Sequence, residues 1–298
     1  MHICKFYIIF AQLFTQRYNA MNKISKSQIR FIRSLAHKKE RDAAGVFVAE
    51  GIKCTEELLG YFEPLLVAAT AERLPQLQSK IDASILYEAS GKDIEMMSSL
   101  RTPQGVLAVF KREASRKCAD AQTDSDECGQ CPEAGCQNNT VLALDGVQDP
   151  GNLGTIIRTA DWFGVSDIVC SKDTADCWSS KVVQSTMGSL SRVCVHYCEL
   201  EEWLREQKSA YPTLPVYGTL LNGRNIYEPD AMSKEEGGII IMGNEGNGIS
   251  VGIRKLITHP LLIPAFPHTK QNGHPESLNV AIATAVTLAE KRRRSGCL

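Results

Sequence analysis

The strongest constraint on the fold is a rhythm that begins at Val141, where short apolar runs alternate with longer stretches of helical spacing. The apolar runs cover residues 141–144, 168–170, 193–195, 216–217, 239–242 and 261–263. Strands that alternate with helices in this way predict a mostly parallel sheet with helices on both faces. Ligands of such sheets bind beyond the carboxyl ends of the strands, so we expect function in the loops after Leu144, Met242 and Ile263.

A compact mixed pattern precedes this region. The elements expected there are a helix from Ser27, a strand at 46–48, a helix opening at Gly51, and buried strands at 65–68 and 106–110. They predict a small α/β sandwich. A polar segment with almost no large apolar side chain follows, which indicates a linker.

The expected organisation therefore has four parts. They are an extension over 1–20 outside the fold, a first domain over 21–111, a linker over 112–140 and a second domain over 141–298. The apolar stretch from Lys5 to Phe14 lacks the small-residue cleavage site of a signal peptide, and Met21 is a second candidate for the start of translation. No apolar run approaches the length of about 18–20 residues that a membrane span needs, so no membrane contact is expected.

The 11 cysteines are an odd number, and several lie inside apolar runs, as Cys170 and Cys194 do. This pattern predicts reduced thiols in a cytoplasmic protein. The linker carries a further group with one C-x-x-C pair: Cys118, Cys128, Cys131 and Cys136. Their irregular spacing favours an ordinary linker without metal, and a small zinc site stays the alternative.

Positive charge is concentrated in two places, although the chain as a whole is nearly neutral, with 33 Lys and Arg against 34 Asp and Glu. Residues 21–43 hold seven cations and two acids, and the run Lys291–Arg294 lies close to the C-terminus. Two local basic patches predict an anionic partner that is bound locally. Solvated helix faces are the alternative for both patches.

The first candidate loop and its helix read Asp145-Gly-Val-Gln-Asp-Pro-Gly-Asn-Leu-Gly-Thr-Ile-Ile-Arg158. Gly151 and Gly154 permit a tight turn, and Asn152 is expected to cap the helix. Arg158 lies on a different helix face from the buried apolar positions. Ordinary surface arginines share that placement, so this motif alone does not establish a site.

The second candidate loop, Gly243-Asn-Glu-Gly-Asn-Gly248, follows a buried strand, and its glycines let a ligand approach the backbone closely. A dinucleotide-binding turn is the alternative, but the G-x-G-x-x-G order is absent. The third candidate begins at Ile263-Pro264 and resumes at Glu276-Ser-Leu-Asn279, ahead of an Ala-rich helix over 280–289. Glu276 and Ser277 could simply cap that helix.

Taken together, Asn-Leu-Gly-x-x-x-Arg, Gly-Asn-Glu-Gly-x-Gly, Ile-Pro and Glu-Ser-Leu-Asn-Val resemble the SpoU/TrmH family of RNA ribose methyltransferases. The resemblance covers 141–294 and includes the helical segment 181–189 between the first two motifs. Phe47–Gly51 and Thr102–Val106 are similar to the L30e-like substrate-binding domain often fused upstream. The loop Ala265–Pro275 is longer than the short turn expected there, which leaves the roles of His268, Lys270 and His274 open.

This resemblance implies a SPOUT α/β domain with a trefoil knot, S-adenosylmethionine as cofactor, and a homodimer with a shared active site. The catalytic residues it implies are Arg158, Asn152, Ser277 and Asn279. The cofactor-binding residues it implies are Thr219, Leu220, Gly243, Asn244, Glu245, Gly246, Ile263, Pro264, Ser277 and Leu278. RNA binding is assigned to the first basic patch, through Lys23, Lys26, Arg30, Arg33, Lys38, Lys39 and Arg41.

The expected function is transfer of a methyl group from S-adenosylmethionine to a ribose 2′-hydroxyl, with 23S ribosomal RNA preferred over transfer RNA because of the fused upstream domain. A non-catalytic RNA-binding or ribosome-assembly factor and a nucleotide-dependent oxidoreductase are the alternatives. Because an arginine side chain stays charged at neutral pH, Arg158 is expected to stabilise a developing alkoxide and to orient the hydroxyl. Proton removal by a deprotonated Arg158 is the competing version.

Overall fold

The computed structural model describes residues 22–114, 139–234, 237–266 and 277–296. These residues form two compact units. The first unit comprises 22–114 together with 178–191, and the second comprises 139–177 and 192–296. The four linker cysteines and the expected extension lie outside the described residues. No helix in the described ranges combines the length and the apolar character needed to cross a bilayer.

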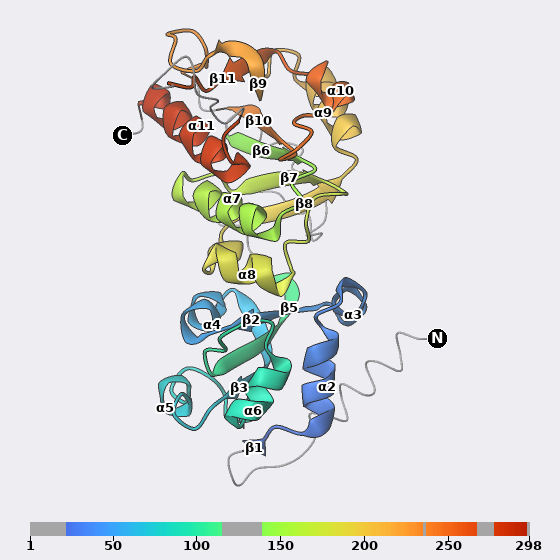
Figure 1. Ribbon diagram of the computed structural model, residues 1–298, viewed down its shortest axis with the longest axis vertical. Helices are drawn as coiled ribbons and strands as arrows, with labels where there is room; N and C mark the ends of the chain where they lie inside the picture. Colours follow the sequence, from blue (N-terminus) through green and yellow to red (C-terminus); the bar gives the residue numbers. More distant parts are fainter. Residues whose placement is uncertain (1–21, 115–138, 235–236, 267–276, 297–298) are drawn as a thin grey trace, which may run out of the picture. The chain divides into compact units, whose positions relative to one another are not determined.

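The first unit is a five-stranded mixed sheet flanked by short helices (Figure 1). Its strands are β1 (Asn22–Lys23), β2 (Val46–Glu50), β3 (Phe62–Ala69), β4 (Leu86–Glu88) and β5 (Val106–Ala114). Its helices are α2 (Lys26–Ser34), α3 (Lys38–Ala44), α4 (Ile52–Leu58), α5 (Leu74–Leu77), α6 (Gly91–Met97), α8 (Ser180–Thr186) and the 3₁₀ turn η1 (Ser189–Ser191). The strand order is β1-β4-β3-β5-β2, with β5 antiparallel to both of its neighbours, which confirms the predicted α/β fold of this part.

Local sequence explains where α2 begins. The Ser25 Oγ accepts from the Gln28 backbone N–H at 3.2 Å, and the Gln28 side chain accepts from the Ser25 N–H at 2.8 Å. This reciprocal pair satisfies two N–H groups that a helix start otherwise leaves unpaired. Ile29 and Ile32 then place one apolar face in a core shared with β2, β3 and β5.

One segment of the first unit comes from far along the chain. The Trp178 ring lies 4.8 Å from the Phe47 ring and 5.9 Å from the Phe62 ring, measured between centroids. Val182 and Val183 of α8 are fully buried, and α8 packs against β2. The sequence pattern places this segment in the second domain, but its apolar side chains are buried within the first unit.

The second unit is a six-stranded sheet in which every pairing is parallel, as predicted. Its strands are β6 (Thr140–Asp145), β7 (Asp167–Ser171), β8 (Cys194–Cys198), β9 (Val216–Asn225), β10 (Gly238–Gly243) and β11 (His259–Leu262). Its helices are α7 (Pro150–Trp162), α9 (Leu200–Ala210), α10 (Val251–Arg254) and α11 (Val280–Ser295). The strand order is β11-β9-β10-β6-β7-β8.

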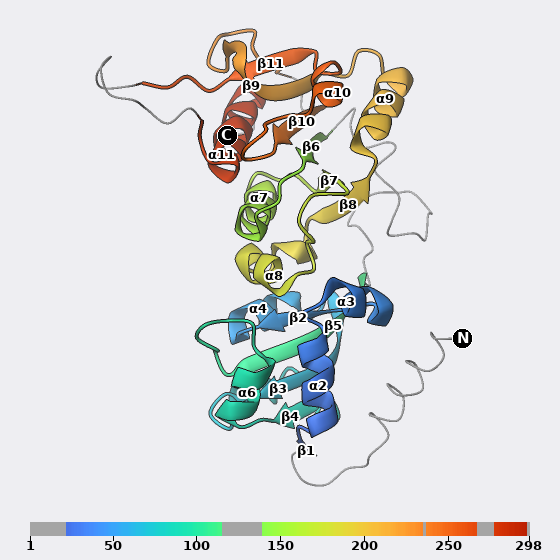
Figure 2. The same cartoon turned by 45° about the vertical axis from the view of Figure 1, so that its right-hand side comes forward.

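Helices cover both faces of this sheet. α7 and α11 lie side by side on one face, and α9 and α10 lie on the other (Figures 1 and 2). Trp203, Leu204 and Ile253 from the α9–α10 side pack on strand residues such as Ala143 and Ile241. The strand order β11-β9-β10-β6 places the carboxyl ends of β6, β10 and β11 at one end of this parallel sheet, and the candidate loops begin there.

The basic run near the C-terminus, Lys291–Arg294, is not a ligand-binding patch. Lys291 is buried, and its Nζ lies 3.3 Å and 3.4 Å from the carbonyl oxygens of Ser233 and Gly237. Arg292 donates from Nε to the Phe163 carbonyl at 2.7 Å. Lys291 and Arg292 are therefore bound by backbone carbonyl oxygens of the second unit.

The last two cations of this run converge on one buried acid. Arg293 and Arg294 each approach a Glu290 oxygen at 2.7 Å, and Glu290 is only 5% exposed. Arg294 also donates to the carbonyl oxygens of Ile226 and Glu228, at 2.8 Å and 2.6 Å. The cations of this run are thus bound to carbonyl oxygens and to Glu290, which argues against the predicted second anion-binding patch.

Candidate active site

The loop after β6 is fixed at both ends by carboxylates. Asp145 Oδ2 accepts from the Ser250 backbone N–H at 2.6 Å, and Asp149 Oδ1 accepts from the Asn152 N–H at 2.8 Å. Asp149 is thus the N-cap of α7, with Pro150 at the first helical position. The predicted cap at Asn152 is wrong, because this residue lies inside the first turn. Its side chain is left for another contact.

The loop after β10 is closed tightly on itself. A Cβ at Gly243 would lie 2.4 Å from the carbonyl carbon of Gly248, so only glycine fits there. The Asn244 side chain donates from Nδ2 to the Gly146 carbonyl at 2.7 Å and accepts at Oδ1 from the Gly246 N–H at 2.9 Å. Asn244 therefore fixes the second candidate loop against the first.

Three side chains, one from each candidate motif, form a continuous hydrogen-bonded chain that we call the motif network. Asn152 Nδ2 donates to Glu245 Oε1 at 2.9 Å, across 93 residues of sequence. Asn279 Nδ2 donates to Asn152 Oδ1 at 2.9 Å, across 127 residues. Glu245 also approaches the backbone N–H groups of Gln148 and Asp149, at 3.4 Å each. The network positions all three motifs at one end of the sheet.

Arg158 lies further along α7 than the motif network. Its side chain is exposed, and it forms no hydrogen bond or ion pair with any residue that the structure describes. Thr155, also exposed, lies between Asn152 and Arg158, while Leu153 and Ile157 on the opposite side are fully buried. An exposed guanidinium without an internal partner is available to an anion.

The cofactor residues expected on β9 lie in an interruption of the sheet. Between its pairing with Pro260 and its pairing with Leu261, β9 skips residues 219–223. Thr219 and Leu220 fall in this bulge and are half-buried, and Leu220 packs on the core beneath it. Half-buried side chains at a carboxyl strand end can form the wall of a ligand site.

The remaining expected site residues flank the stretch 267–276, which lies outside the described residues together with His268, Lys270, His274 and Glu276. Ile263 and Pro264 follow β11 and are half-buried, whereas Ser277 and Leu278 are exposed. Asn279 is the N-cap of α11, and its Oδ1 accepts from the Ala281 N–H at 2.9 Å. Asn279, and not Ser277, is therefore the residue that caps α11.

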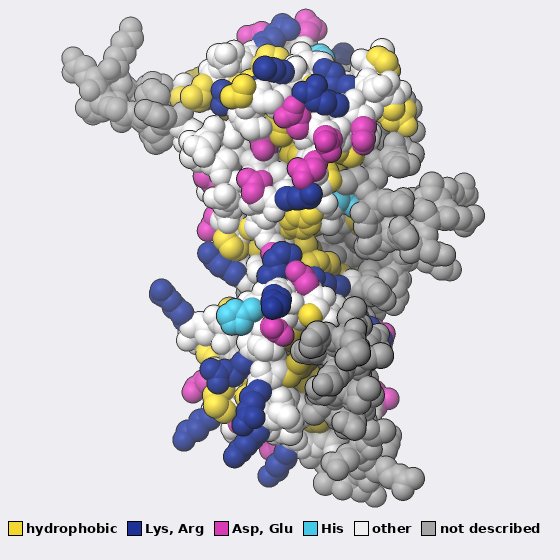
Figure 3. Space-filling view, turned by 90° about the vertical axis from the view of Figure 1, so that its right-hand side faces the viewer, with side chains coloured by type: hydrophobic (Ala, Val, Ile, Leu, Met, Phe, Trp, Pro, Cys, Tyr) yellow, Lys and Arg dark blue, Asp and Glu magenta, His cyan; other side chains and the backbone are white. Residues whose placement is uncertain are grey.

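The first basic patch is mostly accessible. Figure 3 shows Lys and Arg side chains gathered over the helices that carry this patch. Five of its cations are exposed, and their side chains form no hydrogen bond or ion pair with a described residue: Lys23, Lys26, Arg30, Arg33 and Lys39. Lys38 is also exposed and pairs with Asp42 at 3.1 Å.

Arg41 does not belong to this accessible set. It is 3% exposed, and its Nη1 donates to the carbonyl oxygens of Leu35 and Ala36, at 2.7 Å and 2.8 Å. The side chain ties α3 to the end of α2. Its assignment to RNA binding is therefore wrong, because a guanidinium buried in this way cannot reach a phosphate.

Comparison with known proteins identifies the family. The model of the SpoU rRNA Methylase family matches residues 139–289, just over half of the chain. This chain belongs to the SpoU rRNA methylase family. The model of the MRM3-like substrate binding domain matches residues 26–108 of the same SpoU methylase.

Individual relatives agree with this membership. RlmP of Bacillus subtilis, a 23S rRNA (guanosine(2553)-2′-O)-methyltransferase, is 30% identical over 87% of this chain and 94% of its own length. The AdoMet-bound rRNA methyltransferase from Sinorhizobium meliloti has a TM-score of 0.70 and 30% identity, covering 91% of this chain and 96% of that one. A TrmH-family protein from Porphyromonas gingivalis has a TM-score of 0.74 and 36% identity, covering 91% and 99%. The predicted family, fold class, enzyme class and cofactor, S-adenosylmethionine, are confirmed.

Several residues that shape the SpoU methylase site escaped the sequence analysis. Asp149 caps α7 and Asp145 holds the amide of Ser250, although neither was a candidate. An Asp directly before a Pro and ahead of a helical run is a readable cap signal. The contact between Asp145 and Ser250 had no such signal, because it joins two loops 105 residues apart.

Proposed function

We propose that this SpoU methylase transfers the methyl group of S-adenosylmethionine to a ribose 2′-hydroxyl of 23S ribosomal RNA. The observation that carries the proposal is the motif network, in which Asn152, Glu245 and Asn279 join three separate loops at the carboxyl end of a parallel sheet. Arg158 extends from the same helix with no described internal partner. Transfer RNA is the second candidate substrate, and the proteins named above favour ribosomal RNA.

The residues around this sheet end fit S-adenosylmethionine. The bend at Gly243, where a Cβ would meet the Gly248 backbone, leaves the loop backbone free of side-chain bulk. Half-buried Leu220, Ile263 and Pro264 offer apolar surface suited to an adenine ring. We assign the cofactor to these residues together with Thr219, Asn244, Glu245, Gly246, Ser277 and Leu278. When bound, it supplies an electrophilic methyl group.

The chain's own residues have to orient the ribose and stabilise charge on its oxygen. Asn152 is held between Glu245 and Asn279, so its amide is positioned before substrate arrives. Arg158, exposed further along α7, supplies the positive charge that stabilises the alkoxide as the 2′-oxygen attacks. Ser277 lies exposed ahead of α11 and adds a hydroxyl to the polar residues assigned to the site.

The Arg158→Ala variant tests this assignment. Loss of a charge stabiliser is expected to lower methyl transfer at least about 10²-fold while binding of S-adenosylmethionine is nearly kept. Transfer is measured with radiolabelled cofactor on 23S and transfer RNA transcripts, and cofactor binding is measured by calorimetry. Arg205→Ala is the matched control, because Arg205 is exposed and pairs only with Glu201 among the contacts described. A variant that keeps more than about a tenth of wild-type turnover contradicts the catalytic role of Arg158.

The proposal includes a homodimer and a trefoil knot, as the family resemblance implies, and a cytoplasmic location, as the cysteine pattern predicts. Large apolar side chains lie open on the adjacent helices α7 and α11, with Trp162 86% exposed and Ile282 52% exposed. A second copy that covers them would remove a large apolar patch from water. The Trp162→Glu/Ile282→Glu variant is expected to be monomeric by light scattering. Val251→Glu, at a 69% exposed position of α10, is the control, and a monomeric wild-type chain contradicts the dimer.

A further inference from the structure

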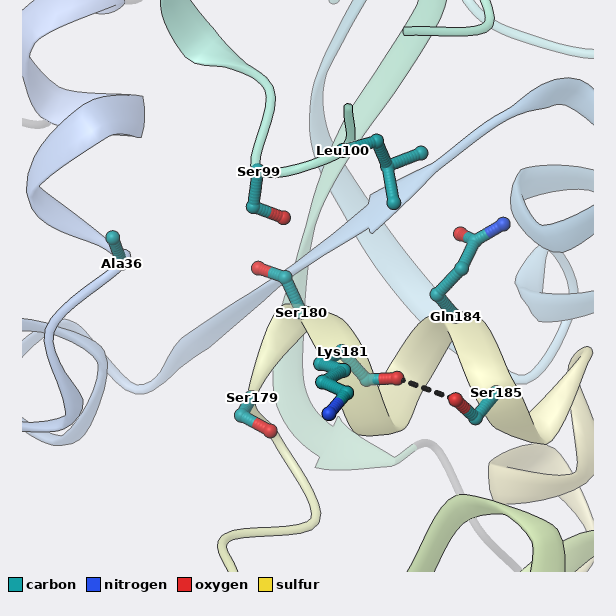
Figure 4. Close-up of a pocket in the computed structure, with 8 residues that line it drawn as sticks. All are labelled: Ala36, Ser99, Leu100, Ser179, Ser180, Lys181, Gln184 and Ser185. Carbon is teal, nitrogen blue, oxygen red and sulfur yellow. Dashed lines mark hydrogen bonds between the residues drawn. The ribbon is translucent and has the colours of Figure 1, made fainter. Parts of the chain in front are cut away.

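A cavity of about 350 Å³ opens on the first unit (Figure 4). Its lining comes from the end of α2, the segment after α6, and α8: Ala36, Ser99, Leu100, Ser179, Ser180, Lys181, Gln184 and Ser185. A neighbouring depression shares Ala36, Ser99 and Ser180 with it and adds Arg33, His37 and Met96. The two depressions are therefore continuous.

The wall that carries Ser99 is rigidly built. Glu50 is only 4% exposed, and its carboxylate accepts from the Ser99 Oγ at 2.7 Å, from the Ser99 N–H at 2.9 Å and from the Ser98 hydroxyl. Since the Ser99 hydroxyl donates to Glu50, its oxygen faces the cavity as an acceptor. In Figure 4 the Ser99 and Ser180 side chains point toward one another across the opening.

The opposite wall carries hydrogen-bonding capacity that the chain does not use. Ser179 Oγ and Gln184 Oε1 are buried atoms without a hydrogen-bond partner among the described residues. The Ser180 hydroxyl likewise forms no hydrogen bond with any described residue, whereas the Ser185 hydroxyl is satisfied by the Lys181 carbonyl at 2.8 Å. Buried polar atoms normally have partners, so this cluster of unpaired groups at a cavity indicates a ligand.

We infer that this cavity holds a single unstacked nucleobase of the RNA substrate. This inference rests on the proposed function, which makes RNA the substrate. It adds a site on the first unit that binds one base of that RNA. A phosphate fits the lining poorly, because it only accepts hydrogen bonds and leaves Gln184 Oε1 without a donor. A base edge offers N–H donors and ring or carbonyl acceptors together, which match Gln184, Ser180 and Ser99.

The surroundings favour a nucleic acid over a neutral ligand. Arg33 and His37 are exposed at the rim of the adjoining depression, and Lys181 is exposed beside α8. These side chains suit the phosphates that flank an unstacked base. Leu100, and Met96 at 48% exposure, supply apolar surface against which the base can lie.

Binding by the full-length protein tests the inference. Fluorescence anisotropy is measured with labelled single-stranded homopolymers of A, C, G and U and with a fully paired RNA duplex of the same length. The Ser180→Ala/Gln184→Leu double variant is expected to bind its preferred single strand about tenfold more weakly or worse, since it loses two hydrogen bonds. Duplex affinity and the dependence on salt should not change, because no charge is removed.

Matched controls separate the cavity from general effects. Ser185→Ala removes a hydroxyl that is already satisfied, and Gln76→Leu makes the same amide-to-alkyl change at an exposed position of α5. Neither control should alter RNA affinity. Gln184→Leu should leave thermal stability unchanged or raised, because it removes a buried oxygen without a partner. If Gln184→Leu lowers thermal stability instead, the test uses the Ser180→Ala single variant. Its affinity for single-stranded RNA should then be lower than that of the wild type.

The outcomes distinguish this inference from the proposed function. Unchanged single-strand affinity in the double variant, or an equal loss for duplex and single strand, overturns the base pocket. Wild-type protein that transfers methyl groups while the pocket variants bind RNA normally overturns the pocket alone. Wild-type protein that binds RNA through the pocket without transferring a methyl group overturns the proposed reaction alone. A wild-type chain with no affinity for any of these RNAs overturns the pocket, and one that also transfers no methyl group to 23S or transfer RNA transcripts overturns both.

Discussion

The two basic segments of this chain look alike in sequence and have opposite uses in the structure. Over α2 and α3, most cations are exposed and free of described internal partners, as Lys26 and Arg30 are. Near the end of α11, Lys291 and Arg294 are buried against carbonyl oxygens and Glu290. The density of positive charge in a sequence therefore does not distinguish cations that bind a ligand from cations that stabilise the fold. Whether backbone carbonyls or acids of the same fold surround the cations decides between the two uses.

The largest expected effect comes from removing the contacts of Arg294 near the end of α11. Arg294→Ala should lower the free energy of unfolding by about 3–5 kcal/mol, because it leaves Glu290 buried with one fewer partner and strips three carbonyl oxygens of their donor. Urea denaturation measures this. Arg293→Ala is the matched control, since it contacts the same acid from a side chain that is 59% exposed and should cost less than about 1 kcal/mol. An equal loss of unfolding free energy in the two variants would show that the buried Arg294 contributes no more to stability than the exposed Arg293.

The exposed segment should show the converse. The Lys26→Gln/Arg30→Gln/Arg33→Gln variant is expected to bind RNA about ten- to a hundredfold more weakly, with a salt slope reduced by about 2 and little change in stability. Titrations at several salt concentrations measure both quantities. The control removes two cations of the same unit that already pair with acids, Lys80 and Lys111. A salt slope that stays at the wild-type value would show that this segment does not contact phosphates.

One residue sharpens the comparison inside the exposed segment itself. Arg41→Ala should cost about 1–3 kcal/mol of stability, because two carbonyl oxygens at the end of α2 lose their donor, and should leave RNA affinity unchanged. Lys39→Ala should do the reverse, since its side chain is exposed without a described partner. Thermal melting and anisotropy on both variants decide this. Loss of RNA affinity in a stably folded Arg41→Ala variant would return Arg41 to the binding surface.

The smallest effect concerns acid. Hydrogen bonds from Arg293 and Arg294 lower the pKa of Glu290 below its ordinary value of 4.5, against the opposing effect of burial. A lowered folded-state pKa adds stability that is fully present above 4.5 and is lost as the pH falls through the folded value. Melting temperature measured between pH 7 and pH 3 should therefore fall more in wild type than in Glu290→Gln. Parallel curves for the two proteins would mean that Glu290 does not titrate with unfolding.

Much of the fold could be read from the sequence because apolar periodicity dictates it. The strands of the second unit lie close to their expected positions, since parallel strands buried on both faces are nearly continuous apolar runs. The short elements β1, β4 and α5 were not predicted, because a few residues leave no periodic signal. The burial of Trp178–Ser191 in the first unit depends on contacts across the chain, which no local pattern encodes.

The candidate site could be predicted in outline for a different reason. Loops after parallel strands meet at one sheet end, so motifs far apart in sequence could be expected near each other, and the motif network joins Asn152, Glu245 and Asn279 there. The helix caps were misassigned because several adjacent residues could serve, and only backbone geometry selects Asp149 and Asn279. Arg41 was misassigned because it sits among exposed cations yet faces inward.

The strand order of the second unit also sets how the chain can be made. β6 is hydrogen-bonded to β10 from Thr140↔Gly238 to Asp145↔Gly243. This central pair of strands can therefore form only after nearly a hundred further residues have been synthesised. During translation, β6 with β7 and β8 presents an apolar, unpaired strand edge, the kind of surface on which nascent chains aggregate. Sheets dominated by such distant pairings fold slowly. We therefore expect the nascent chain to need chaperones that bind this exposed strand edge until β10 has emerged from the ribosome.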